Sequence, residues 1–194
     1  MVRAMLIAVL ITIGLQGNAQ TESRITRYNY FFLEAIRQQE MGNLAAAFDL
    51  LNHARDINPK APEVYYEIAG YYVAMQNSKA ARYNFEQAAK LAPDNSTYLE
   101  KLGQFYISQN NYEDALTTYE QLYTSNKTRE DVLQILYQLY GAQNNYKKMI
   151  EMIERMELLS GASEQLSLTK MQIYEQMGDK RKAQAELLRL VQKN

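Results

Sequence analysis

The sequence predicts an all-helical protein built from repeated pairs of antiparallel helices. Tyr72, Tyr106, Tyr140 and Tyr174 follow one another at intervals of 34 residues. The 194 residues include only eight Gly and three Pro, which favours helices over a turn-rich β fold. One helix pair cannot bury its own apolar face, so we expect neighbouring pairs to stack into a solenoid.

The 34-residue interval divides most of the chain into five repeats that align without insertion or deletion. They cover residues 28–61, 62–95, 96–129, 130–163 and 164–194. Near its middle each repeat has a turn-favouring pair: Gly42-Asn43, Gln76-Asn77, Asn110-Asn111, Asn144-Asn145 and Gly178-Asp179. Gly and Asn tolerate the left-handed conformation that ends a helix. Each repeat is therefore predicted to be a helix, a turn and a second helix.

Small and bulky residues recur at fixed positions of the repeat, counted from its first residue. In the second repeat, positions 4, 7, 8, 11, 20, 24, 27 and 32 hold Tyr65, Ile68, Ala69, Tyr72, Ala81, Phe85, Ala88 and Pro93. This pattern resembles the tetratricopeptide repeat family over residues 28–194. The resemblance implies a right-handed α-solenoid of about five repeats. Most of the 16 tyrosines are then predicted to pack between helix layers, among them Tyr112 and Tyr119.

The N-terminus has the features of a secretory signal peptide over residues 1–19. A basic Arg3 precedes a twelve-residue, mostly apolar stretch, and Gly17-Asn18-Ala19 offers small residues for cleavage after Ala19. An uncleaved N-terminal anchor is the alternative. Residues 20–27 are predicted to be a short linker. Because the chain has no Cys, the sequence favours export to the periplasm or bacterial cell envelope over a disulfide-bonded secreted protein.

Composition argues against enzymatic chemistry. The chain has no Cys and a single His, His53, and it lacks phosphate-binding, dinucleotide and metal motifs. We therefore expect no catalytic residues, no metal, no cofactor and no enzyme activity. The 21 basic and 22 acidic residues nearly cancel, so we also expect no nucleic-acid partner and, after signal cleavage, no membrane span.

The resemblance also implies where a partner would bind. In this family positions 2, 5, 9, 12 and 13 of the first helices line a concave groove; here those positions contain five acids and no Lys or Arg. The candidate groove residues are Phe32, Ile36, Tyr66, Val73, Glu100, Gln104, Ile107, Gln134 and Gln138. Such a surface suits a neutral to mildly basic protein or peptide segment, with Phe32, Tyr66, Val73 and Ile107 as apolar anchors.

We therefore predict an exported, non-catalytic scaffold for protein–protein interaction. Two alternatives are a sensor or regulatory domain of a longer envelope protein and, less favoured, an enzyme with an unrecognised carboxylate site.

The final helix ends in apolar residues, including Leu187, Leu190 and Val191. Three explanations are open: the array continues in a longer protein, this end self-associates with another copy, or Ser167 and Lys170 make the last repeat more polar.

Overall fold

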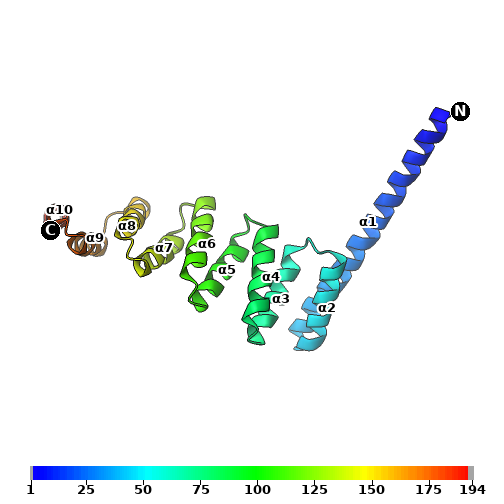
Figure 1. The fold of residues 1–194 in the computed structure, drawn as a ribbon, viewed down its shortest axis with the longest axis horizontal. Coiled ribbons are helices and arrows are strands. Elements are labelled where there is room, and N and C mark those ends of the chain that lie inside the picture. The colour runs from blue at the N-terminus through cyan, green and yellow to red at the C-terminus, as the bar shows by residue number, and fades with distance from the viewer. Residues whose placement is uncertain (1, 192–194) are drawn as a thin grey trace. The chain divides into compact units, whose positions relative to one another are not determined.

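Ten helices make up the part of the chain that the computed structural model describes, which is the backbone of residues 2–191 and the side chains of residues 21–191 (Figure 1). They are α1 (Val2–Glu40), α2 (Leu44–Ile57), α3 (Pro62–Ala74), α4 (Ser78–Leu91), α5 (Ser96–Ser108), α6 (Tyr112–Ser125), α7 (Glu130–Ala142), α8 (Tyr146–Ser160), α9 (Glu164–Gln176) and α10 (Lys180–Val191). Residues 2–191 contain no strand. The predicted all-helical fold of paired helices is therefore confirmed.

The helices form two compact halves, which divide between Pro93 and Asp94. In the N-terminal half, α1 packs on α2, α2 on α3 and α3 on α4; in the C-terminal half, each helix from α5 to α10 packs on the next. Each helix pair in a half thus covers apolar surface of its neighbour, as expected for stacked repeats.

The turn inside the second, third and fourth repeats is built by one residue in the left-handed conformation and one capping residue. Gln76, Asn110 and Asn144 have φ values of 57°, 58° and 54°. The following Asn in each case opens the second helix, and its side-chain oxygen accepts a bond from the backbone N–H three residues on. The N–H groups of these capping residues also donate to the carbonyls of Tyr72, Tyr106 and Tyr140. The recurrent tyrosine therefore marks where each first helix ends.

The core follows the repeat positions. In the N-terminal half, Leu51 and Ala54 of α2 cluster with Val64 and Ile68 of α3, and all four are fully buried. In the C-terminal half, Tyr119 occupies the same repeat position as Leu51 and is 1% exposed. Tyr112, predicted to pack between layers, is 41% exposed, so the prediction is wrong for that residue.

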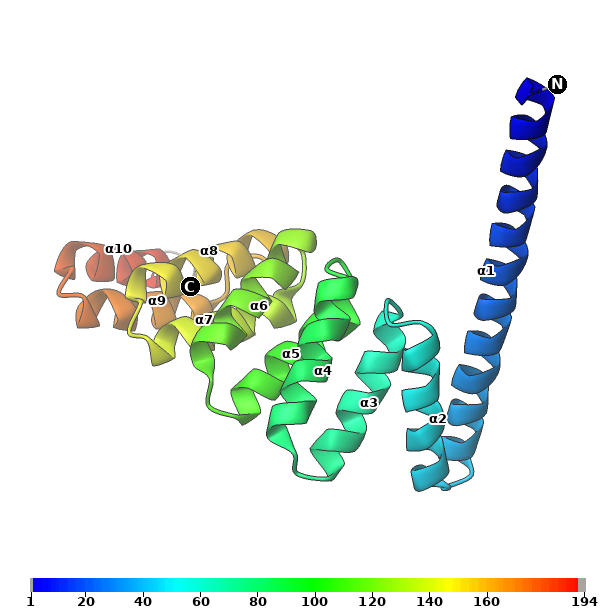
Figure 2. The ribbon, with the colours of Figure 1, turned by 45° about the vertical axis from the view of Figure 1, so that its right-hand side comes forward.

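Helix α1 runs without a break through residues 20–27, which the sequence predicts as a linker. No Pro or Gly interrupts this segment, and Arg24 ties it to α2 because its Nε donates to the carbonyl of Ile57 at 2.6 Å. The last part of α1 lies along α2 and the first part extends beyond it (Figure 2). Within the described residues, no helix combines the length and apolar character needed to cross a membrane.

Ser167 and Lys170 lie inside the last helix layers and do not make the exposed end polar, which removes the third explanation for that end. Each is only 3% exposed. The Lys170 Nζ lies 2.8 Å from a carboxylate oxygen of Glu157 on α8 and 2.9 Å from one of Glu186 on α10. The lysine is thus buried with its counter-charges around it.

Candidate protein-binding faces

In the N-terminal half, two hydrogen bonds bring the predicted groove positions of α1 and α3 together. The Tyr28 hydroxyl donates to the carboxylate of Glu63, and the Tyr71 hydroxyl donates to the Gln39 side-chain oxygen at 3.1 Å. Gln39 and Glu63 are both groove positions by the family pattern, so the two first helices present one continuous face here.

The predicted anchors of this half lie at its surface and are partly fixed by ring contacts. Phe32 stacks on Tyr28 with 5.9 Å between ring centroids, and Tyr66 meets Phe85 edge to face at 6.3 Å. Both rings are half-buried, as is Ile36, whereas Val73 is exposed. An aromatic ring that is already oriented loses little conformational freedom when a ligand packs on it.

Glu67 is an additional polar group on this face that the sequence prediction missed. Its side chain is half-buried, and burial raises its pKa, while a hydrogen bond from Gln39 opposes the rise. The family positions used for the prediction skip position 6 of the repeat. The signal was nonetheless available, because Glu67 follows Glu63 by one helical turn.

In the C-terminal half, the corresponding faces of α5 and α7 are dominated by uncharged amides. Gln104, Gln134 and Gln138 are exposed, and Ile107 is half-buried beside them on α5. Gln104 and Gln138 occupy the same repeat position, as does the exposed Gln172 on α9. A primary amide both donates and accepts hydrogen bonds, so it can bind the main chain of an extended segment.

Arg129 changes the charge of this face, and the sequence prediction missed it. The residue caps the start of α7, and its guanidinium pairs with the carboxylates of Glu100 and Asp131. These hydrogen bonds raise the pKa of Arg129 and lower that of Asp131. Two of the five groove acids are therefore neutralised. Counting helix positions could not reveal a partner supplied by the preceding loop.

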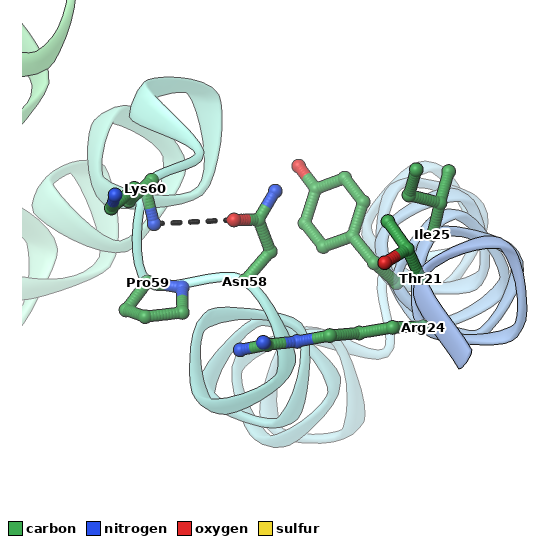
Figure 3. Close-up of a pocket in the computed structure, with 7 residues that line it drawn as sticks. Thr21, Arg24, Ile25, Asn58, Pro59 and Lys60 are labelled. Atoms are coloured by element: carbon green, nitrogen blue, oxygen red, sulfur yellow. Dashed lines mark hydrogen bonds between the residues drawn. The ribbon is translucent and has the colours of Figure 1, made fainter. Parts of the chain in front are cut away.

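Two cavities lie away from the predicted groove residues. The first, about 300 Å³, is lined by Thr21, Arg24, Ile25 and Tyr28 of α1 and by Asn58, Pro59 and Lys60 of the loop after α2 (Figure 3). The second, about 570 Å³, lies between α9 and α10.

His53, the single histidine, packs its ring 5.2 Å from that of Phe31 on α1.

Comparison with known proteins places the fold. Two family models described as tetratricopeptide repeat match residues 62–95 and 99–133. No curated protein sequence matches the chain.

Solved structures share the fold at low sequence identity. MamA from Desulfovibrio magneticus RS-1 is 15% identical with a TM-score of 0.58, over 86% of this chain and 94% of that one. YrrB, a TPR protein described as having an unusual peptide-binding site, is 15% identical with a TM-score of 0.61, over 84% of each chain. A tetratricopeptide repeat protein from Parabacteroides merdae ATCC 43184 is 17% identical with a TM-score of 0.63, over 87% of this chain and 67% of that one.

The repeat period, the helix pairs and these matches agree: the chain carries tetratricopeptide repeats over residues 62–95 and 99–133 and has the fold of a tetratricopeptide repeat solenoid.

Proposed function

We propose that this protein is an exported, non-catalytic scaffold that binds extended segments of partner proteins on the faces of its first helices. The observation that carries the proposal is the side-chain chemistry of those faces. In both halves they combine accessible apolar groups with uncharged amides or hydrogen-bonded acids. The peptide-binding site described for YrrB is in keeping with this use of the fold.

The partner segment that fits best is neutral to mildly basic. Glu63 and Glu67 give the α1–α3 face acidic character, whereas Arg129 offsets Glu100 and Asp131 on the α5–α7 face. An acidic segment would find no unpaired Lys or Arg at the predicted groove positions. Apolar side chains of the partner would pack on Tyr66 or Val73 in one half and on Ile107 in the other.

A peptide-binding experiment tests this proposal. A library of unstructured peptides that vary in net charge and aromatic content is screened on the immobilised protein, and the tightest binders are titrated in solution. We expect Tyr66→Ala and Ile107→Ala each to weaken a peptide bound on its own face about tenfold, because anchors at an interface carry most of the binding energy. Leu158→Ala, at an exposed leucine of the second helix α8, is the matched control. Preferential binding of acidic peptides, or unchanged affinity in both anchor variants, would contradict the proposal.

We further propose that residues 1–19 direct export to the periplasm or cell envelope of a bacterium and are removed after Ala19. The support is the order of a basic residue, an apolar stretch and small residues at the cleavage point. Intact-mass measurement of the exported protein tests this. The expected chain begins at Gln20, and a mass that retains residues 1–19 would rule out cleavage.

A further inference from the structure

The last helix pair exposes a repeat position that is buried everywhere else in the array. Position 24 is occupied by Leu51, Phe85, Tyr119 and Ile153 in the first four repeats, and each is at most 7% exposed. In the fifth repeat the same position is Leu187, which is 48% exposed. The residue at this position is therefore still apolar, but nothing within residues 21–191 buries it as in the first four repeats.

The N-terminal half shows what covers position 24 elsewhere. Leu51 of α2 packs in a buried cluster with Val64 and Ile68, which are positions 3 and 7 of the next first helix, α3. The natural occupant of this surface is therefore the first helix of a following repeat.

The surface around Leu187 has room for such a helix. The cavity of about 570 Å³ is lined by Met171 and Glu175 of α9 and by Lys180, Ala183, Gln184 and Leu187 of α10. Val191, one turn beyond Leu187, is also exposed. An apolar strip on α10 thus lies beside a hollow between the last two helices.

At the other end of the chain, α1 exposes apolar residues, one of them at position 3, which packs on position 24 of the preceding repeat in the N-terminal half. Position 3 is fully buried as Val64 and almost fully as Val132, but in α1 it is Tyr30, which is 64% exposed. Leu33, one turn further along α1, and Met41, just beyond its end, are exposed large apolar residues as well. Position 3 is half-buried as Tyr98 and Leu166, and position 7 of α1 is the half-buried Glu34, which pairs with Arg37. The first helix therefore exposes an aromatic ring at a position that α3 and α7 bury, with Leu33 beside it.

Charge complements the two ends. Consecutive helices of the array are joined by short turns and run antiparallel, so a helix docked on α10 in the same way brings its C-terminal end to the start of α10. The start of α10 carries exposed Lys180 and Arg181, and the end of α1 carries exposed Glu40. None of these three is in an ion pair within residues 21–191. Opposite charges arranged in this way favour one orientation and suppress others.

We propose that two copies of this protein associate head to tail, with α1 of one copy docking on α9 and α10 of the other as the next first helix of the array. The interface is heterologous, since different surfaces meet, and it leaves one free end of each kind. Such contacts add copies into open chains and do not close on a dimer. The residues altered in the test below, Tyr30 and Leu187, are not among the proposed groove residues, so either proposal can fail without the other.

Complementary end variants test the proposal. Tyr30→Glu blocks the α1 end and Leu187→Glu blocks the α10 end; both residues are exposed, so the fold is expected to persist, and circular dichroism verifies it. Sedimentation velocity is then run over a concentration series on protein whose N-terminus is established by intact mass. The unaltered protein is expected to grow in mass with concentration, and each variant alone to stay a single copy. An equimolar mixture of the two is expected to reach twice that mass and stop.

Three outcomes would overturn the proposal. The unaltered protein could stay a single copy at all concentrations. Tyr30→Glu could still dimerise alone, which would mean that α10 ends pair with each other. The mixture could fail to form dimers. Leu158→Glu introduces the same charge at an exposed leucine of α8, away from both ends, and should behave like the unaltered protein.

Discussion

At the scale of single residues, the ring of Tyr119 packs so closely on Gly103 of α5 that no larger residue fits there. A Cβ atom at this position would lie 2.6 Å from Cε2 of Tyr119, and that ring is buried and cannot move aside. Position 8 is also small in the first two repeats, as the fully buried Ala35 and Ala69. The absence of a side chain at Gly103 lets α5 and α6 approach closely enough for the Tyr119 ring to fill the space between them.

Gly103→Ala is therefore expected to destabilise the protein by about 1–3 kcal/mol, because the added methyl group overpacks the core. Gly70→Ala is the matched control, since nothing lies within 4 Å of a Cβ at that helical position. It should stabilise the protein by roughly 0.5–1 kcal/mol, because Ala has the higher helix propensity. Urea denaturation measures both, and equal effects would remove the steric explanation.

Lys170 is the second residue whose surroundings decide its effect. Lys170→Met removes the buried counter-charge of Glu157 and Glu186 and leaves them only the more exposed Arg189, so we expect a loss of about 3 kcal/mol in the free energy of unfolding. The triple variant Lys170→Met/Glu157→Leu/Glu186→Leu should recover most of this loss, because it also removes the two buried carboxylates that Lys170 compensates. If urea denaturation shows an unchanged free energy of unfolding in Lys170→Met, this account is wrong.

The pH dependence of this contribution has a definite sign. Burial alone lowers the pKa of Lys170, but the hydrogen bonds to Glu157 and Glu186 outweigh it and raise the pKa. A raised pKa in the folded state stabilises it fully below the ordinary lysine pKa of about 10.4. The benefit is lost as the pH rises through the folded-state value. As the pH rises into the strongly alkaline range, the stability difference between the unaltered protein and Lys170→Met should therefore shrink.

At the scale of helices and turns, the local sequence was enough to predict most of the structure. The apolar spacing and the turn pairs are local signals, and they predicted the helix pairs from residue 28 onward. What they missed depends on residues distant in the chain. Arg129 reaches Glu100 only because the chain folds back, and Lys170 is tolerated inside only because Glu157 and Glu186 converge on it. The linker prediction failed because residues 20–27 contain no breaker.

The turn of the second repeat offers a prediction at this scale. Gln76 adopts a φ of 57°, which costs a side chain with a Cβ atom more than it costs glycine. Gln76→Gly should raise the free energy of unfolding by about 0.5–1 kcal/mol. Asn144→Gly, at the equivalent turn, should gain less, because Asn tolerates this conformation better. Thermal unfolding compares the two, and a loss of stability in Gln76→Gly would contradict the explanation.

At the scale of the whole molecule, contacts between neighbouring helices make stability uneven along the chain. Helix α6 buries Ala115, Thr118, Tyr119 and Leu122, whereas Ala183 is the one buried residue of α10 within its described range. In dilute protein we expect the amides of α10 to exchange with solvent much faster than those of α6, because local opening there exposes little new surface. Hydrogen exchange by mass spectrometry measures this, and equal protection would indicate a single cooperative unit.

The recurrence of the same caps and packing positions also determines how the length of this protein can change. A duplication or deletion of 34 residues, starting at any point of a repeat, preserves every cap and every alternation of small and bulky residues. An insertion of any other length inside a helix rotates the downstream side chains away from their partners. Changes in the length of the array during evolution should therefore add or remove whole repeats. The same rule applies to the design of longer or shorter versions of this protein.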